Sequence, residues 1–246
     1  MIPYKRQQTI LDLLSQEEVV RFSDIQELLP EVSESTLRRD VRELEADGRL
    51  QRLSGGAVKA AGGPRETPIS VKAAIHVGEK RAIAAAAAAL VEDGETVYVD
   101  SGSTCSALLA LLMARPVTVV TTNADAFSLA GADPCATLVM LGGILSPDLS
   151  SVYGPMTEEN VGRFVFDRAF LGANGVDVRF GVTTPSMQES NKKQVVAEHA
   201  KETYVLADSS KFGEVLNVRV LPLDRVTVVS DRSDPAVAAE TRVITA

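Results

Sequence analysis

The chain lacks several features that would place it in broad classes of protein. It has no Trp, only 4% aromatic residues, and two cysteines, Cys105 and Cys135, among 246 residues. Two distant cysteines are too few for a disulfide framework and, with isolated His76 and His199, suggest no zinc site. The amino-terminal residues contain no apolar signal core, and the longest alanine-rich run, 82–91, is shorter than the about 20 residues that span a bilayer. We therefore predict a cytoplasmic protein without membrane segments, metals or cofactors.

The common nucleotide-binding motifs are also absent. No G-x-x-x-x-G-K-[ST] segment is present and no G-x-G-x-x-G segment follows a predicted strand, so an ATPase phosphate loop is not supported. The formal net charge of -8 argues against indiscriminate binding of polyanions. Basic residues are nevertheless concentrated, because five of the eight Lys and Arg residues in 1–58 lie between Arg38 and Arg52.

The first part of the chain has the pattern of three helices and a hairpin. Apolar spacing predicts a helix over 4–14, and a short second helix that Ser23 caps and Pro30 ends. A third helix is expected to begin after a cap at Ser33 and to end at Gly48. The following stretch, RLQRLSGGAVKA, has two extended runs around a Gly-Gly pair, which predicts a β-hairpin, or wing.

The predicted third helix has an apolar side and a basic side. Leu37, Val41 and Leu44 recur at i, i+4 and i+7, which predicts a buried stripe. At about 100° per residue, positions on the other side are polar and mostly basic. The outward residues are Ser35, Arg38, Arg39 and Arg42, and the acids Glu34, Asp40 and Glu45 are expected nearer the flanks.

A narrow basic face of this kind suits contact with nucleic acid. Guanidinium groups pair with guanine edges and phosphates, and recognition helices usually present their amino-terminal part to the DNA groove. One alternative is an ordinary solvated helix with an Arg39–Glu43 pair, and another is a protein-binding module, because residues 1–58 hold eleven acids against eight basic residues. The expected DNA-binding residues are Ser33, Ser35, Thr36, Arg38, Arg39, Arg42, Arg49 and Arg52.

The stretch VSESTLRRDVRELEADGRLQRLSGGAV closely resembles the winged helix of the DeoR family of bacterial regulators that respond to sugar phosphates. The family pattern is V-S-x-x-T-[IL]-R-R-D-L-x-x-L-x-x-x-G, followed by a wing that ends in G-G-A. This chain departs from it at Ser54, where the family often has His or Tyr, so a wing contact by that side chain is in doubt. The resemblance implies that the third helix enters the major groove of DNA.

Beyond the wing the pattern changes to strands that alternate with helices. Such alternation predicts βαβ units and a mostly parallel, Rossmann-like α/β sheet. A continuous apolar run at Val117–Val120 fits a strand that is buried on both faces. The expected divisions are a winged helix-turn-helix domain over 1–58, a linker over 59–72 and a second domain over 73–246.

The stretch VYVDSGST predicts a strand that runs into a polar turn and then a helix. Free N–H groups and the positive end of the helix dipole can bind an anion there, and Gly102 lets the backbone approach it closely. A plain Ser/Thr helix cap is the alternative. Polar groups also follow other predicted strands, at Asn174, Asp177 and Lys211, and ligands of α/β proteins bind at such strand ends.

These segments together resemble the effector domain of the DeoR family, which is related in fold to ribose-5-phosphate isomerase, glucosamine-6-phosphate deaminase and CoA transferases. D-S-G-[ST]-T matches 100–104, G-A-N-G-[IV]-D matches 172–177, E-x-x-x-K matches 189–193 and D-x-S-K-F-G matches 208–213. The resemblance implies that Ser101–Thr104 hold an effector phosphate and that lysines supply positive charge. The residues implied or expected to bind the effector are Asp100, Ser101, Gly102, Ser103, Thr104, Asn123, Gly143, Asn174, Asp177, Glu189, Lys193 and Lys211.

We therefore expect a DNA-binding transcriptional regulator, a repressor of a sugar or polyol operon that is controlled by a phosphorylated sugar. Paired half-sites in DNA favour a homo-oligomer, either a dimer or a tetramer. The competing hypothesis is a sugar-phosphate isomerase or deaminase with an accessory DNA-binding domain, for which Asp177 and Glu189 offer carboxylates. The related isomerases have an acidic cluster where this chain has Asn174, and an amide cannot act as a general base.

Overall fold

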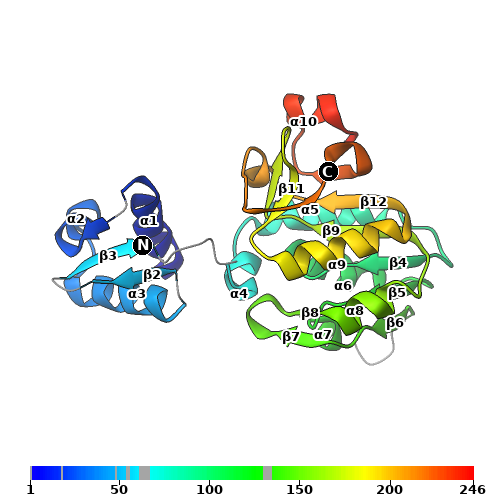
Figure 1. The fold of residues 1–246 in the computed structure, drawn as a ribbon, viewed down its shortest axis with the longest axis horizontal. Coiled ribbons are helices and arrows are strands. Elements are labelled where there is room, and N and C mark those ends of the chain that lie inside the picture. Colours follow the sequence, from blue (N-terminus) through cyan, green and yellow to red (C-terminus); the bar gives the residue numbers. More distant parts are fainter. Residues whose placement is uncertain (1, 18, 48, 54–55, 61–66, 130–134) are drawn as a thin grey trace. The chain divides into compact units, whose positions relative to one another are not determined.

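The protein forms two compact units, an amino-terminal unit over 1–65 and a carboxy-terminal unit over 66–246 (Figure 1). The structure is a computed structural model, and it describes residues 2–17, 19–47, 49–53, 56–60, 67–129 and 135–246. The amino-terminal unit contains α1 (Pro3–Gln16), β1 (Val19–Arg21), α2 (Phe22–Leu28), α3 (Glu34–Ala46), β2 (Leu50–Arg52) and β3 (Ala57–Ala60).

The core of the amino-terminal unit confirms the apolar stripe expected on its third helix. Leu37, Val41 and Leu44 of α3 are buried, and they pack with Ile10 of α1 and Ile25 of α2. Complete burial of one such side chain stabilises the folded state by about 1.5–3 kcal/mol. The unit therefore has an ordinary helical core in spite of its small size.

A buried ion pair also joins α1 to α3. Asp40 is only 1% exposed, and its carboxylate accepts hydrogen bonds from Arg6 Nε at 2.7 Å and from a second guanidinium nitrogen at 3.0 Å. The sequence places Asp40 nearer a flank of the helix, and the structure shows that this flank is buried at Asp40. Its partner lies 34 positions earlier in the chain, and the paired geometry makes burial of both charges tolerable.

Three short strands form the wing sheet of this unit, in the order β1-β3-β2. The predicted hairpin is confirmed as β2 and β3, which pair antiparallel, whereas β1 pairs with the other side of β3 and was not predicted. The second helix begins at Phe22, and the Asp24 carboxylate accepts the Arg21 N–H at 2.9 Å, so the predicted cap at Ser23 is wrong. The predicted helix end at Gly48 lies outside the described residues.

The limits of the expected linker also differ from the observed elements. Lys59 pairs with Val19 and Gln51 inside the wing sheet, so the ordered sheet continues past residue 58. The other end of the expected linker forms a short helix, α4 (Ile69–Ala73). Residues 61–66 lie outside the described part of the chain.

A seven-stranded sheet, parallel throughout, forms the centre of the carboxy-terminal unit and confirms the predicted Rossmann-like class. Four adjacent strands in its interior are β12, β9, β4 and β5, in that order, so strands that are distant in sequence lie side by side. From one edge to the other the strands are β15 (Val243–Thr245), β14 (Thr227–Ser230), β12 (Ala200–Leu206), β9 (Phe166–Gly172), β4 (Thr96–Val99), β5 (Thr118–Thr121) and β6 (Thr137–Met140).

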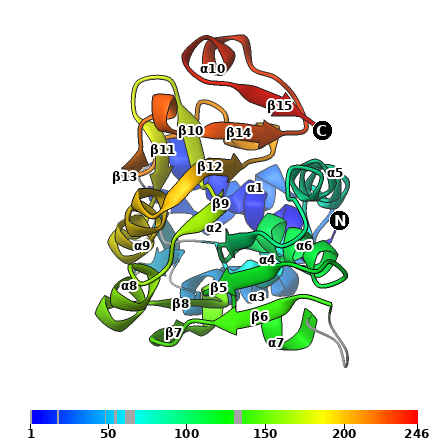
Figure 2. The ribbon, with the colours of Figure 1, turned by 90° about the vertical axis from the view of Figure 1, so that its right-hand side faces the viewer.

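Helices cover both faces of this sheet, α5 (Val77–Ala88) and α6 (Ser103–Leu112) on one side and α8 (Pro155–Val161) and α9 (Met187–Glu198) on the other (Figure 2). Val97 and Val99 of β4 pack on the α5–α6 side, and Tyr98 between them packs on the α9 side. Because successive strand residues point to opposite faces, an uninterrupted apolar strand fills two cores at once.

Two smaller antiparallel sheets complete the carboxy-terminal unit, with strand orders β10-β11-β13 and β7-β8. No helix in the described part of the chain is long and apolar enough to cross a membrane. The remaining elements are α7 (Ala126–Leu129), β7 (Ile144–Ser146), η1 (Pro147–Leu149), β8 (Ser151–Tyr153), β10 (Gly175–Asp177), β11 (Gly181–Thr184), η2 (Ser209–Lys211), β13 (Val218–Leu221), η3 (Leu223–Arg225) and α10 (Pro235–Glu240).

Candidate nucleic-acid interface and ligand pocket

The start of α3 is held by a cluster of hydroxyl groups. Ser33 caps the helix as predicted, and its Oγ accepts the Thr36 N–H at 3.4 Å. The same oxygen lies 2.8 Å from Thr36 Oγ1 and 3.1 Å from Ser35 Oγ. These three side chains are therefore gathered at the amino-terminal end of the helix, where a recognition helix meets DNA.

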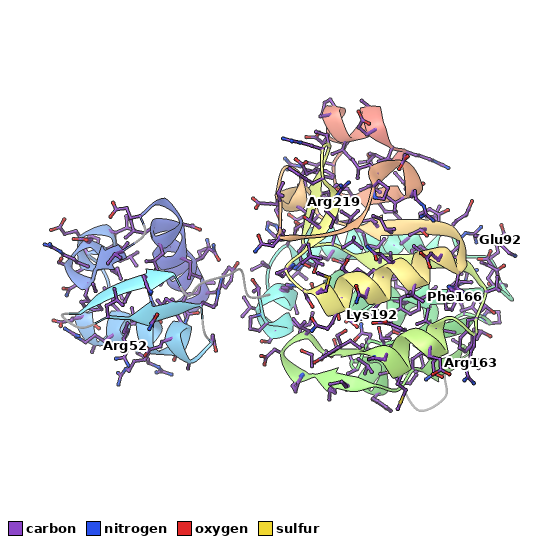
Figure 3. All side chains as sticks on the ribbon, viewed as in Figure 1. Arg52, Glu92, Arg163, Phe166, Lys192 and Arg219 are labelled. Atoms are coloured by element: carbon purple, nitrogen blue, oxygen red, sulfur yellow. The ribbon has the colours of Figure 1, made fainter. Side chains whose placement is uncertain are left out.

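The arginines of α3 and β2 are exposed, and most of them have a carboxylate partner. Arg38 pairs with Glu34 at 2.6 Å, Arg39 with Glu43 at 2.9 Å, and Arg52 with Glu45 at 2.5 Å (Figure 3 labels Arg52). Such exposed pairs contribute about 0–1 kcal/mol each. The arginines can therefore exchange a glutamate for a phosphate at little cost.

Arg42 differs from its neighbours on the same helix. Its Nε donates to the Arg38 carbonyl at 3.2 Å, and its guanidinium has no carboxylate partner among the described residues. Arg38, Arg42 and Arg52 together line a hollow between α3 and the wing, and the Arg38 guanidinium lies 4.4 Å from the centre of the Phe22 ring. The structure thus brings three of the predicted arginines to one concave basic surface.

Arg49 does not join this surface. It is partly buried, and burial lowers the pKa of its guanidinium, an effect that nearby Tyr4 and two carboxylates oppose. Tyr4 belongs to α1, so the Arg49 side chain lies toward that helix. The expected phosphate contact of Arg49 has less geometric support than those of the other arginines.

A pocket lies in the carboxy-terminal unit, at the carboxyl ends of three adjacent strands, β4, β9 and β12. This is the edge of a parallel sheet at which α/β proteins bind ligands. The pocket is lined by Ile69, Lys72, Ile75, Lys80, Ser101, Gly102, Ser103, Thr104, Cys105, Leu149, Ser151, Gly172, Ala173, Asn174, Glu189, Lys193, Leu206, Ala207, Asp208 and Lys211.

The turn from β4 to α6 forms one wall of the pocket, as predicted. Gly102 has φ +123°, a conformation that side chains disfavour, and it precedes the first residue of the ten-residue α6. Ser101 and Thr104 are buried, and Ser101 Oγ lies 3.3 Å from Thr122 Oγ1. The free N–H groups at the start of α6 therefore border the pocket together with hydroxyl groups, an arrangement that favours an anion.

Beneath this turn lies a group of buried charges, one from the end of β4 and three from α9. Asp100 follows β4 and is fully buried; its Oδ2 accepts from Lys193 Nζ of α9 and from the Gly172 N–H at 3.2 Å. Lys192 is fully buried as well (Figure 3), and its Nζ lies 3.5 Å from Asp100 Oδ1 and 3.0 Å from Glu189 Oε1. Ser151 Oγ donates to that same Glu189 oxygen at 2.8 Å. Two lysines and two carboxylates are thus balanced in one network.

Asp100 and Lys193 of this network stay charged in spite of burial. Burial acts to raise the pKa of Asp100, but the Lys193 and Lys192 ammoniums outweigh it and hold the pKa below its usual value. Burial acts to lower the pKa of Lys193, and the Asp100 carboxylate reverses this and raises it. Each group therefore stabilises the charged form of its neighbour, and the floor of the pocket is a fixed set of ion pairs.

The structure places most of the predicted effector residues at or under the pocket, but not all of them. Asn123 is buried, and its Nδ2 donates to Ser106 Oγ at 2.9 Å, so it braces the α6 region from outside the lining. A side chain at Gly143 would collide with Thr157, so that glycine serves close packing. Asp177 caps the turn between β10 and β11 by accepting the Arg179 and Phe180 N–H groups, both at 2.8 Å. Pocket contacts predicted for these three residues are not supported by their positions.

Several pocket residues were not predicted from the sequence. Lys72 and Lys80 line the pocket from α4 and α5, and Lys192 extends the ion pairs beneath it. Lys192 immediately precedes the predicted Lys193. Neighbouring helix positions usually face different ways, so the prediction of Lys193 gave no reason to expect Lys192 beneath the pocket. Lys80 lies between Glu79 and Arg81 at the start of an alanine-rich helix, where a charged residue gives no sign of a pocket, and only the tertiary fold brings it to the strand ends.

Both units match one family of proteins. Residues 6–61 match the DeoR-like helix-turn-helix domain, and residues 75–232 match the DeoR C terminal sensor domain. Fold and sites therefore define a DNA-binding transcriptional regulator whose larger unit is a sensor. The chain belongs to the DeoR family, as the motifs of the third helix and the strand-end loops indicated.

Individual relatives support this assignment. The chain is 36% identical over 217 residues to a Bacillus subtilis protein described as uncharacterized HTH-type transcriptional regulator FruR, a match that covers 87% of this chain and 85% of the relative. It is 30% identical to a putative aga operon transcriptional repressor of Escherichia coli O157:H7, over 96% of this chain and 89% of the relative.

The solved ribose 5-phosphate isomerase A of Methanocaldococcus jannaschii shows a weaker likeness, with 24% identity, a TM-score of 0.39 and coverage of 54% of this chain and 53% of that one.

Proposed function

We propose that this regulator represses an operon for the use of a sugar or polyol, and that a phosphorylated sugar in the carboxy-terminal pocket controls its binding to DNA. The observation that carries the proposal is the pocket itself. It joins the amino-terminal end of α6, buried carboxylates and several lysines at the carboxyl edge of one sheet. One relative's name, an operon repressor, agrees with the direction of control.

The pocket offers separate groups for the two parts of a sugar phosphate. Ser101–Thr104 present N–H and hydroxyl donors to a phosphate, and Lys211 adds a half-buried ammonium with no carboxylate partner among the described residues. Glu189 and Asn174 offer oxygen and amide groups to sugar hydroxyls. The lysines and carboxylates beneath the pocket balance each other's charge. The lysines at the pocket wall are therefore the groups that can balance the charge of the phosphate.

A thermal-unfolding screen against sugar phosphates tests the effector class. A ligand at 100 times its Kd adds about 2.7 kcal/mol to the free energy of unfolding, which raises the Tm by several degrees. We expect a phosphorylated sugar to raise the Tm, the unphosphorylated sugar to have no effect, and Lys211→Met to reduce the response. A screen in which no phosphorylated sugar or polyol acts on the wild type would remove this part of the proposal.

DNA binding places Arg42 and its neighbours in a major groove, with Arg52 at flanking phosphates. Fluorescence anisotropy with DNA from upstream of the chain's own operon measures this directly, at low and moderate salt. We expect tight binding that weakens steeply as salt rises, because phosphate contacts release counterions. Absence of binding at low salt, with and without the effector, would contradict the function.

We also propose that the protein acts in the cytoplasm. We propose further that it is a homo-oligomer, a dimer or a tetramer, because one winged helix makes few base contacts and paired half-sites in the DNA supply the rest. Light scattering of the purified protein gives the mass of the particle, and a strict monomer that still binds operator DNA tightly would contradict this.

Catalysis is not part of the proposal. Asn174 stands where the related isomerases have an acidic cluster, and its amide cannot act as a general base, while the Asp100 carboxylate has a lowered pKa and is a weak base. We expect no turnover when the purified protein is incubated with pentose or hexosamine phosphates.

A further inference from the structure

Helix α4 forms part of the pocket wall, yet it is only lightly anchored. Ile69 and Lys72 of α4, and Ile75 just after it, line the pocket. No residue of α4 is buried, and the helix packs on α6 and η1. Elements with little buried surface dock with small free energies, which a ligand that contacts only the docked form can shift. α4 is also the first helix after residues 61–66, the segment through which the two units are joined in the chain.

Lys80 of α5 ties this helix to the rest of the unit. Its side chain is buried, at 7% exposure, and its ammonium donates to the carbonyl of Lys72 and, at 2.8 Å, to that of Ile75. These carbonyls belong to the carboxyl end of α4 and its following turn, where a cation is favoured. An ammonium has three donors, so one remains for a ligand in the pocket that Lys80 also lines.

The charges around Lys80 favour an anionic ligand. Burial lowers the pKa of Lys80, the Asp208 and Glu79 carboxylates oppose this, and Lys211 and Lys72 reinforce it. Lys72, Lys80, Lys211 and Asp208 all line this wall of the pocket, so lysines outnumber carboxylates among its lining residues, whereas the ion pairs of the floor are balanced. A phosphate that enters between them relieves the repulsion among the lysines and makes strong, charge-assisted hydrogen bonds.

The turn between α4 and α5 is itself held in an unfavourable conformation. His76 has φ +52° and ψ +39°, the left-handed region that residues other than glycine seldom adopt. Such conformations persist only where the surroundings impose them. The Lys80 hydrogen bonds to the carbonyls of Lys72 and Ile75, just before His76, are contacts of that kind.

We propose that Lys80 is a further effector-binding residue and that it couples the pocket to α4, because the same ammonium holds the phosphate and the carboxyl end of that helix. Occupation of the pocket then favours the docked form of α4, the first helix of the chain after the amino-terminal unit. This rests on the proposed phosphate pocket, and it adds the residue and the helix through which occupancy is transmitted.

Hydrogen exchange of the full chain, with inorganic phosphate as the probe, tests both parts of the proposal. The wild type is compared with Lys80→Met, which removes the ammonium but keeps the buried stem, and with Lys211→Met, which removes a pocket lysine that makes no hydrogen bond or ion pair to α4 among the described residues. Amides of 71–75 report α4, amides of 102–104 report the phosphate loop, and amides of β9 and β12 report whether each variant is folded. The phosphate concentration is varied to saturation for every variant.

We expect Lys80→Met to speed exchange in α4 several-fold without phosphate, and Lys211→Met to leave it unchanged. Phosphate should slow exchange in the loop and in α4 of the wild type, and Lys80→Met should weaken phosphate binding about tenfold or more. If phosphate protects the loop but α4 of the wild type does not respond, or if Lys80→Met behaves like wild type in either measurement, the coupling is refuted. If phosphate fails to protect the loop of the wild type, the phosphate pocket fails and the coupling falls with it.

Discussion

The basic surface of the amino-terminal unit and the pocket of the carboxy-terminal unit use their positive charges in opposite ways. In the amino-terminal unit the arginines of α3 and β2 are exposed. The carboxylate partners of Arg38, Arg39 and Arg52 all lie on α3. In the carboxy-terminal unit Lys192 and Lys193 are buried, and their carboxylate partners come from another element as well as from α9. Exposed local pairs are exchanged easily for a phosphate, whereas buried pairs hold a structure in place. The first arrangement suits a surface that binds and releases DNA, and the second suits the floor of a selective pocket.

The largest effect should follow from breaking a buried pair. Lys193→Met removes the ammonium that bonds Asp100, and leaves that buried carboxylate with the Gly172 N–H and with Lys192, 3.5 Å away, as its remaining cation among the described residues. Loss of one partner of a buried pair costs about 3–5 kcal/mol, measured here as the free energy of unfolding in urea. The matched control is Lys201→Met, whose ammonium pairs with Asp167 at 2.7 Å while its side chain is 67% exposed, and which should cost less than about 1 kcal/mol. Equal costs for the two variants would remove the contrast between buried and exposed pairs.

The sequence allowed good prediction of features that depend on local spacing. The cap at Ser33, the buried stripe of Leu37, Val41 and Leu44, and the turn from β4 into α6 follow from residues within a few positions of one another. The order of helices and strands followed in the same way, from periodicity and turn residues.

Features that depend on distant partners could not be predicted. Asp40 occupies a position that a helical wheel places on the flank, and only Arg6, 34 positions away, makes its burial possible. Lys80 reaches the pocket because α5 packs beside strand ends that are formed later in the chain. Asp177 looked like a pocket residue because it ends a motif after a strand, but the chain turns back there as a hairpin and uses the carboxylate as its cap.

A smaller effect is expected on DNA affinity, and it should differ among the arginines of α3. Arg42→Ala should weaken operator binding by about 1–3 kcal/mol, because its guanidinium is free of carboxylates among the described residues and lines the basic hollow. Arg39→Ala is the matched control, and it should cost less, since Arg39 must first leave Glu43. Anisotropy titrations at two salt concentrations measure both. A larger loss for Arg39 than for Arg42 would show that the exposed pair, and not the hollow, marks the base contact.

The smallest predicted effect is a gain in affinity from releasing an exposed arginine. Glu34→Gln removes the carboxylate that lies 2.6 Å from Arg38 and takes one negative charge from the surface that we propose binds DNA. Because an exposed pair contributes about 0.2–1 kcal/mol, operator binding should strengthen by no more than that amount. Glu159→Gln makes the same change of charge in the exposed Glu159–Arg163 pair of the other unit, at 2.7 Å, and should leave DNA affinity unchanged. Equal gains from both variants would mean that the net negative charge of the chain weakens DNA binding wherever it lies. A gain from Glu34→Gln alone would mean that each glutamate of α3 limits the DNA contact of the arginine with which it pairs.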